Sequence, residues 1–372
     1  MAGIYIHIPF CKQACTYCNF HFSTSLLYKS DLINAIVKEI NINELSDTQE
    51  IVETIYFGGG TPSLCTRDEL RLILNTINKK YQVLPTAEIT LECNPDDMTK
   101  DYLKSLRDIG INRLSIGIQS FHEEDLYFMN RAHSAHEGEQ SVDNALSVGF
   151  ENLSIDLIYG SPTTTNKMWI SNVDRVLSKE IAHISAYCLT IEPKTVLHKR
   201  YKQGLFKMED QLANDQYTYL MDSLAAGGYD HYEISNFALP NQHAKHNTNY
   251  WNNVNYLGIG PSAHGYDGAK RRWNVKNNNQ YVKLINDGKK YWDEEVLTLE
   301  DQYNEYIMTK LRTMWGVNVK ELEGRFLPYS QHFYKNVSIF VDQERVIKTA
   351  DTITLTRSGK FYADYIASEL FV

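Results

Sequence analysis

The chain has 372 residues, a length that suits two domains better than one. Hydrophobic residues make up 43% of the sequence and charged residues 22%, which is the composition of a globular protein with a large core. The formal net charge of −9 argues against a general nucleic-acid-binding function, because such a protein needs a basic surface.

The N-terminal sequence lacks the pattern of a signal peptide, because its first apolar run, residues 4–8, is short and has no basic flank. The chain also has no apolar run of the ~18 residues that span a bilayer. We therefore expect a cytoplasmic protein without a transmembrane segment. In that reducing compartment, clustered cysteines are expected to be ligands or catalytic groups rather than disulfides.

Short runs rich in Ile, Leu, Tyr and Phe alternate with amphipathic patterns along the first part of the chain. The predicted strands are residues 4–8, 54–59, 88–93, 113–119, 152–160 and 183–190. The clearest predicted helices are residues 30–42, 66–81 and 99–110. Thr66 and Glu69 form the pattern of a capping box at the start of the second helix. Six strand-then-helix units predict an α/β fold with parallel strands, a partial (β/α)6 TIM-like barrel two units short of closure.

The pattern changes after about residue 240, so we predict two domains, residues 1–240 and 241–372. Segment 239–274 is rich in Asn, His and aromatic residues and is expected to be a loop. Helical patterns and then two strand-like runs with a final helix follow, at residues 300–316, 319–326 and 346–370. The second domain is therefore predicted to be α+β, with helices first and a hairpin later.

Three of the six cysteines, Cys11, Cys15 and Cys18, have the spacing C-x3-C-x2-C directly after the first predicted strand. A structural zinc site needs four ligands, so zinc would require a further side chain such as His7 or His21. An iron–sulfur cluster can use three thiolates and leave one iron open, and we favour this interpretation. The other cysteines are isolated and are expected to be buried structural thiols: Cys65, Cys93 and Cys188.

With Tyr17 before the third cysteine, the spacing resembles the signature of the radical S-adenosylmethionine (SAM) superfamily. This resemblance implies that the three thiolates hold a [4Fe-4S] cluster and that its open iron binds SAM. An electron from the reduced cluster would cleave SAM to a 5′-deoxyadenosyl radical. The protein would orient the cofactors and exclude water and oxygen.

Polar residues and glycines end several predicted strands, where a barrel of this type places its site. Gly59 and Gly60 can form a plain turn, or bare backbone that approaches the methionyl part of SAM. Carboxylates at Glu92 and Asp156 would be costly in apolar strands without a partner, and SAM offers a cation and hydroxyls. Arg131 could pair with the SAM carboxylate.

Six motifs in order, "YIHIPFCKQACTYC", "YFGGGTP", "LECNP", "LSIGIQSF", "MNRAH" and "IDLIYGSP", resemble the family of oxygen-independent coproporphyrinogen III oxidases and their HemW-type relatives. The resemblance extends from about residue 4 to the C-terminus. It implies the following SAM contacts: Tyr5, Gly59, Gly60, Thr61, Glu92, Gln119, Arg131 and Asp156.

The two branches of this family differ two positions after the third cysteine. The decarboxylating oxidases carry a fourth cysteine there and an N-terminal extension, whereas this chain has Phe20 and its first strand begins at residue 4. Oxidation of coproporphyrinogen III to protoporphyrinogen IX is the alternative function. The sequence favours the other branch, the HemW-type heme chaperones, and leaves open whether the protein is an enzyme.

The segments "HYEISNFALP", "KHNTNYW" and "NYLGIGPSAHG" resemble those chaperones and contain their H-N-x-x-Y-W signature. The resemblance implies that this signature binds heme, with imidazole as the axial ligand and two flat aromatic faces for the porphyrin. The signature residues are His246, the axial ligand, and Asn247, Tyr250 and Trp251. Three consecutive basic residues could meet the heme propionates: Lys270, Arg271 and Arg272.

The partners implied are heme, heme-acceptor proteins and an electron donor such as flavodoxin or ferredoxin. No nucleic-acid partner is expected from the acidic composition.

Overall fold

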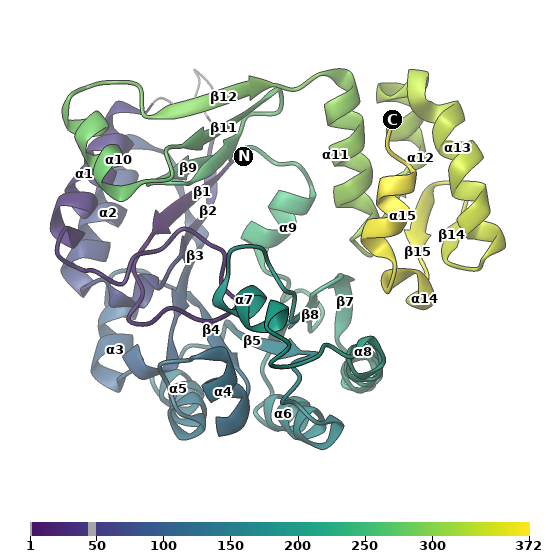
Figure 1. Cartoon of the computed structure of the whole chain (residues 1–372). Helices are drawn as coiled ribbons and strands as arrows, with labels where there is room; N and C mark the ends of the chain where they lie inside the picture. Colours follow the sequence, from purple (N-terminus) through teal and green to yellow (C-terminus); the bar gives the residue numbers. More distant parts are fainter. Residues whose placement is uncertain (1, 44–49) are drawn as a thin grey trace.

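The computed structural model describes residues 2–43 and 50–372, and a twelve-stranded sheet forms its centre (Figure 1). Six of these strands run parallel and lie side by side in chain order, so the partial (β/α)6 barrel predicted from the sequence is confirmed. They are β1 (Ala2–Ile8), β2 (Val52–Gly59), β3 (Val83–Cys93), β4 (Arg113–Gln119), β5 (Leu153–Tyr159) and β6 (His183–Cys188).

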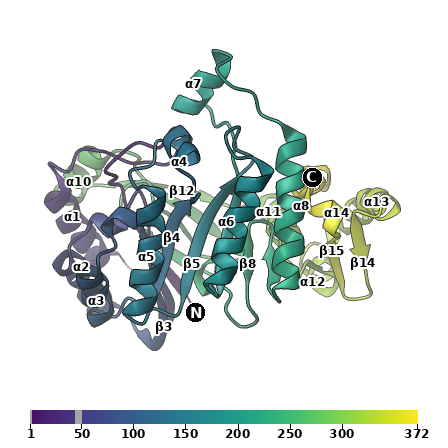
Figure 2. The same ribbon diagram turned by 90° about the horizontal axis from the view of Figure 1, so that it is seen from below.

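Helices that follow these strands cover the outer face of the sheet (Figures 1 and 2). The helix after β2 begins as predicted. The Thr66 hydroxyl accepts a hydrogen bond from the backbone N–H of Glu69, and the Glu69 carboxylate accepts one from the backbone N–H of Thr66. The α-helices are α1 (Lys29–Ile42), α2 (Arg67–Lys80), α3 (Lys100–Asp108), α4 (Glu123–Met129), α5 (Ala135–Ser147), α6 (Asn166–Ser178), α7 (Val196–Lys202) and α8 (Asp210–Ala226). Two short 3-10 helices are η1 (Pro62–Leu64) and η2 (Pro95–Asp97).

The inner face of the barrel is polar, whereas the face toward the helices is apolar. Successive side chains of a strand point to opposite faces. In β1, Ile4, Ile6 and Ile8 are fully buried in the core under the helices, and Tyr5 and His7 point to the inner face. The alternation seen in the sequence therefore creates a polar interior that is available for a ligand.

The sheet continues beyond the six parallel strands at both edges. Strand β9 pairs in parallel with β1, and β8 pairs antiparallel with β6. The added elements are β7 (Asp230–Glu233), β8 (Asn236–Ala238), α9 (Lys245–Trp251), β9 (Tyr256–Ile259), β10 (His264–Tyr266), β11 (Lys270–Asn274), α10 (Asn278–Asn286) and β12 (Trp292–Val296). Segment 239–274, predicted as a loop, therefore contains a helix and three strands. Its strands depend on pairing with the edge of β1, which no local pattern reveals.

The hydrophobic cores separate later in the chain than the predicted boundary at residue 240. Leu257, Ile285 and Tyr291 still belong to the core of the large sheet. A second core begins at Tyr303. The physical reason is that β9 to β12 extend the large sheet, so their side chains are buried against it.

The C-terminal residues form a smaller α+β unit, with helices followed by the predicted hairpin of β14 and β15. The helix α13 was not predicted; Pro328 in its first turn is tolerated, and Phe333, Val337 and Phe340 bury one face at helical spacing. The elements are α11 (Leu299–Leu311), β13 (Val317–Asn318), α12 (Val319–Arg325), α13 (Leu327–Asp342), β14 (Val346–Lys348), β15 (Thr352–Leu355), α14 (Arg357–Lys360) and α15 (Ala363–Glu369).

Candidate functional site

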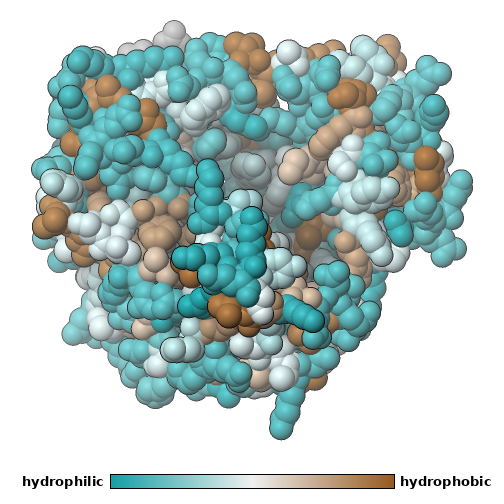
Figure 3. Space-filling model, in the orientation of Figure 1, coloured by the Kyte–Doolittle hydropathy of each residue, from teal (hydrophilic) through white to brown (hydrophobic). Residues whose placement is uncertain are grey.

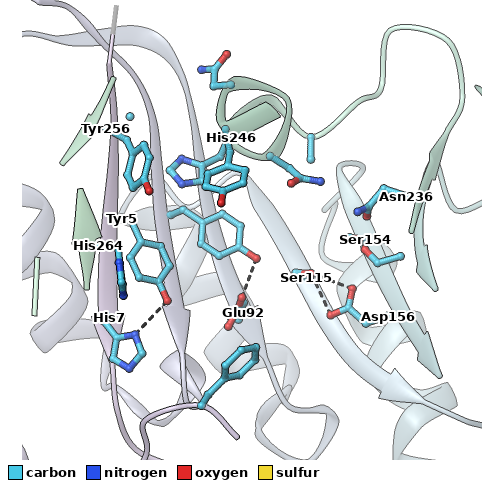
Figure 4. A pocket seen from close by; sticks show the side chains of 18 of the residues that line it. Tyr5, His7, Glu92, Ser115, Ser154, Asp156, Asn236, His246, Tyr256 and His264 are labelled. Atoms are coloured by element: carbon cyan, nitrogen blue, oxygen red, sulfur yellow. Dashed lines mark hydrogen bonds between the residues drawn. The ribbon is translucent and has the colours of Figure 1, made fainter. Parts of the chain in front are cut away.

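A cavity of about 660 Å³ lies against the inner face of the barrel, and we call it the barrel cavity. The six parallel strands, the loop after β1, helix α9 and strand β9 all contribute side chains to its wall. The surface of the molecule is recessed in this region (Figure 3). Figure 4 shows Tyr5 and His7 of β1, Glu92 of β3, Asp156 of β5 and His246 of α9 around it.

The cysteine loop directly follows β1 and is tied to the rest of the barrel by backbone hydrogen bonds. The Cys11 N–H donates to the Ser23 carbonyl at 3.0 Å, and the Thr16 N–H donates to the Met129 carbonyl at 3.0 Å. All three cysteines of the loop are unpaired and partly exposed: Cys11, Cys15 and Cys18. The loop is thus held at the open end of the barrel, next to the wall of the cavity.

Among residues 2–43 and 50–372, no three His, Cys, Asp or Glu side chains converge on a point where one metal ion could bind. A cubane cluster binds each thiolate on a different iron, so it does not need that convergence. His7, which the sequence offered as a fourth zinc ligand, is engaged elsewhere: its ring nitrogens bond to the Tyr5 hydroxyl and the His21 carbonyl.

The glycines after β2 position the cysteine loop rather than line the cavity. The Gly60 N–H donates to the Ile8 carbonyl at 2.9 Å, and the Thr61 N–H donates to the Phe10 carbonyl at 2.6 Å. A Cβ at Gly60 would lie 2.7 Å from the Phe10 carbonyl oxygen. Gly59 has φ of 108°, and a Cβ there would lie 2.5 Å from the His7 ring.

Two carboxyl groups, Glu92 and Asp156, face the barrel cavity, and neither forms an ion pair with a described residue. Glu92 accepts from the Tyr56 hydroxyl at 2.8 Å and from the Gly59 N–H at 3.1 Å, and Asp156 accepts from the Ser115 hydroxyl at 3.2 Å. Burial raises the pKa of Glu92 to about 7 and that of Asp156 to about 6. Each carboxyl group therefore lies in a site that a cation or a pair of ligand hydroxyls would stabilise.

Arg131 joins the cysteine loop to the end of β4. Its guanidinium donates to Cys15 Sγ at 3.2 Å, to Asn94 Oδ1 at 2.9 Å and to the Gly117 carbonyl at 2.7 Å. Its Nε–H is buried and has no hydrogen-bond partner in the described part of the chain. Gln119, which ends β4 with φ of 66°, also places its amide beside Gly117.

These groups have the chemistry that a SAM-ligated cluster requires. Three thiols stand on one loop, a free guanidinium donor suits a carboxylate, and two unpaired carboxyl groups suit a sulfonium, an ammonium or ribose hydroxyls. Of the predicted SAM contacts, Tyr5, Glu92 and Asp156 line the barrel cavity itself. Gly60, Thr61 and Arg131 bond to the cysteine loop or to residues directly before it. Gly59 lies against His7, and Gln119 lies beside Gly117.

Helix α9 places His246 on the wall of the barrel cavity. The carboxylate of Glu88, on β3, accepts the N–H groups of Lys245 at 3.1 Å and His246 at 3.0 Å, which satisfies the first turn of this short helix. The His246 ring stacks on Tyr56, with centroids 5.0 Å apart. Its Nδ1 lies 2.8 Å from the Thr54 hydroxyl, and burial lowers its pKa to about 4. The imidazole is therefore neutral at pH 7.

The rest of the H-N-x-x-Y-W signature divides between two cavities. Asn247 and Tyr250 line the barrel cavity, and Tyr250 also lines a neighbouring cavity of about 450 Å³ that includes Trp251, which we call the side cavity. Asn247 donates weakly to the Tyr232 hydroxyl at 3.4 Å.

The basic residues expected near heme propionates already have protein partners. Lys270 lies 3.8 Å from Glu294, Arg271 forms an ion pair with Glu305, and Arg272 stacks on Trp292. Arg271 alone of the three lines a cavity, the side cavity.

Sequence reasoning missed Tyr56, which lines the barrel cavity, and two residues beside it on β2, Thr54 and Gly58. Tyr56 stacks with both Tyr5 and His246, and Gly58 leaves room beside Glu92, where an added Cβ would lie 3.0 Å from Oε1. Thr54, Tyr56 and Gly58 alternate along β2, so period-two counting within "TIYFGG" was the signal that could have found them.

Comparison with known proteins agrees with this geometry. Residues 5–176 match the Radical SAM superfamily model, and residues 297–362 match the HemN C-terminal domain. The structure of coproporphyrinogen III oxidase (HemN) from Escherichia coli superposes with a TM-score of 0.86 over all of this chain and 90% of that one, at 23% identity. That likeness shows the fold. Fold and site together define a radical SAM protein.

The family within that class follows from sequence identity. The heme chaperone HemW of Lactococcus lactis is 35% identical over 95% of this chain and 93% of its own length. That of Bacillus subtilis is 33% identical over 98% of each. The chain belongs to the HemW family of radical SAM proteins. Within the described residues, no helix combines the length and apolar character needed to cross a membrane.

Proposed function

We propose that this protein is a heme chaperone, which binds heme and delivers it to acceptor proteins under the control of a SAM-ligated [4Fe-4S] cluster. Its curated relatives carry the name heme chaperone HemW. The observation that carries the proposal is the state of His246: a neutral imidazole on a cavity wall, with Nδ1 beside the Thr54 hydroxyl.

The orientation of that ring suits metal ligation. If Nδ1–H donates to Thr54 Oγ1, Nε2 carries the lone pair that a heme iron accepts, and a hydrogen bond at the other nitrogen is the usual way to fix this tautomer. Nε2 has no hydrogen bond to a described residue. Asn247, Tyr250 and Trp251 would lie around the macrocycle as polar and aromatic neighbours.

The cluster and SAM belong to the same proposal. Cys11, Cys15 and Cys18 would hold the cluster, Arg131 would hold the SAM carboxylate, and the other predicted SAM contacts would surround them. When bound, the pair supplies electron transfer and reductive cleavage of SAM. The protein keeps Cys15 beside a guanidinium and offers Glu92 and Asp156 to the cationic part of SAM.

An electron donor such as flavodoxin or ferredoxin would reduce the cluster. Heme-acceptor proteins are the second class of partner. A cytoplasmic location completes the proposal, because all six cysteines are unpaired, which suits a reducing compartment.

Heme titration of the anaerobically reconstituted protein, with and without SAM, tests this function. We expect a Soret band at stoichiometric heme, and transfer of that heme to a candidate acceptor apoprotein. His246→Ala should weaken binding and shift the band, because the axial ligand is lost. An unchanged affinity and spectrum in that variant would place the ligand elsewhere.

The competing function, oxidative decarboxylation of coproporphyrinogen III, is tested in the same preparation. Phe20, 69% exposed on the cavity wall, stands where the oxidases carry a fourth cysteine. Incubation with SAM, reductant and coproporphyrinogen should give no stoichiometric CO2. Stoichiometric CO2 release would replace the chaperone proposal with the oxidase.

A further inference from the structure

The side cavity lies between the edge of the large sheet and the C-terminal unit. Its wall combines aromatic rings of α9 and β9 with side chains of α11 and its C-terminal end. Trp251 and Tyr250 come from the former group, and Met308 and Arg312 from the latter. The cavity therefore offers flat apolar surfaces together with a cation.

Two hydrogen-bond donors of this wall are buried without a partner in the described part of the chain. They are the Trp251 indole N–H and the Arg312 Nε–H. Both groups can only donate, so they require an acceptor. Leaving such donors unpaired costs free energy, and an anionic oxygen is the acceptor that satisfies them best.

The charged residues of the side cavity also indicate an anionic ligand. The lining holds two arginines, Arg271 and Arg312, and one glutamate, Glu305, which pairs with Arg271. Arg312 pairs with Asp364, whose side chain is 79% exposed and does not line the cavity. The Arg312 guanidinium also lies over the Trp251 ring, 5.4 Å from its centroid. The cavity lining itself therefore holds one more arginine than carboxylates, next to an aromatic face.

The side cavity adjoins the barrel cavity. Tyr250 and Tyr256 line both cavities, and Tyr256 is the register partner of Gly3 in β1. A Cβ at Gly3 would lie 3.2 Å from the His246 ring. The side cavity therefore lies beside the wall that carries His246. The barrel cavity, in contrast, presents the carboxyl groups that suit a cation.

We propose that the side cavity binds a carboxylate arm of the heme macrocycle, with Trp251 and Arg312 as its donors. The inference rests on the proposed heme function and adds a residue outside the H-N-x-x-Y-W signature, Arg312. SAM also carries a carboxylate, so the test must distinguish binding of a heme carboxylate from binding of the SAM carboxylate.

The experiment compares ferric heme with heme dimethyl ester, which keeps the ring and the iron but has no carboxylate. Cluster-loaded protein with saturating SAM is titrated anaerobically with each ligand. The variants are Trp251→Phe, which removes the N–H and keeps a ring, and Arg312→Met. Arg345→Met is the matched control, because Arg345 also stacks on an aromatic ring of the C-terminal unit but lies outside both cavities.

We expect wild type and Arg345→Met to bind heme about tenfold more tightly than its ester, the range for a hydrogen bond to a charged group. Each cavity variant should lose that preference by losing affinity for heme alone. Equal affinity of the wild type for both ligands overturns the inference and leaves the heme function standing. Equal losses for both ligands in Trp251→Phe also overturn it, and failure of the wild type to bind either ligand refutes the heme function itself.

Discussion

The Arg131 guanidinium links the cysteine loop to the barrel, because it donates to Cys15 Sγ at 3.2 Å. The same guanidinium is fixed by Asn94 and Gly117, and its Nε–H remains free. One arginine would thus serve both the proposed cluster ligand Cys15 and the proposed anion site beside it.

Cys15→Ser is expected to abolish cluster binding, because only three protein thiolates hold the cluster and two are too few to retain it. After anaerobic reconstitution, iron content and the visible iron–sulfur absorbance should fall to background. Cys188→Ser is the matched control, since Cys188 ends β6 and its thiol is exposed rather than buried as predicted. Four irons retained in Cys15→Ser would contradict the ligand assignment.

Thr54 is expected to position His246 for heme. Thr54→Val keeps the shape of the side chain but removes the partner of Nδ1, 2.8 Å away, so the ligating tautomer is no longer fixed. We expect heme affinity to fall about tenfold, the scale of changes next to a metal ligand, with a shifted Soret band.

The matched control for this change is Thr90→Val. Thr90 is buried on the next strand, and its hydroxyl has no hydrogen-bond partner within the described residues. Thr54→Ser should restore the wild-type spectrum and affinity. If Thr54→Val itself behaves as the wild type does, the Thr54 hydroxyl does not position the ring.

At the scale of elements, one buried carboxyl group connects α1 to the added strands. Glu39 accepts from the Gly260 N–H at 2.7 Å and from the Asn274 amide at 2.8 Å, and it bonds to the Tyr281 hydroxyl. These three partners follow β9, end β11 and lie on α10. These hydrogen bonds to Glu39 explain why the added strands and α10 pack as part of the barrel.

Glu39 should make stability depend on pH. Burial raises its pKa from 4.5 to about 7, against hydrogen bonds from Tyr281, Gly260 and Asn274 and the charge of Arg272, which lower it. Between pH 4.5 and about 7 the folded protein binds a proton that the unfolded chain does not. Stability from this group is therefore complete below 4.5 and falls, by on the order of 3 kcal/mol, as pH rises through that window.

In Glu39→Gln, which cannot titrate, the free energy of unfolding should decrease less steeply across the same window. Denaturant unfolding at several pH values measures this. The slope is expected to shrink rather than vanish, because burial also raises the pKa of Glu92 and Asp156. Glu124→Gln, at an exposed position of α4, should keep the wild-type slope. An identical slope in Glu39→Gln would rule out this role.

At the scale of the whole molecule, ligand binding in the barrel cavity should couple to global stability. A ligand that binds only the folded state adds about 2.7 kcal/mol at a hundred times its dissociation constant. We expect SAM to raise the unfolding temperature of the cluster-loaded protein by several degrees. Because Glu92 and Asp156 are the unpaired carboxyl groups of the cavity, Glu92→Gln and Asp156→Asn should lose most of that rise.

Scanning calorimetry under anaerobic conditions measures this effect. Asp101→Asn, at an exposed position of α3, should keep the full rise with SAM. An undiminished rise in both cavity variants would mean that neither carboxyl group contacts SAM.

The barrel and the three cysteines proposed as cluster ligands could be predicted from the sequence. Alternation of apolar and polar residues within strands, helical periods between them and the Thr66 capping box are local signals, and local signals survive in a single sequence. The cysteine spacing is equally local, because the three thiols share one short loop. Glu92 and Asp156, which are carboxyl groups in apolar strands and need a polar or cationic partner, could also be recognised in the sequence.

How distant segments complete the candidate site depends on packing in three dimensions. Pairing of β9 with β1 extends the large sheet past residue 240, and it sets α9 against the inner face. Contacts of Thr54 and Glu88 with His246 join residues more than 150 positions apart, and the free donors of Trp251 and Arg312 exist only where α9 meets the end of α11. Such contacts depend on packing between separate elements, which no period or spacing along the chain encodes.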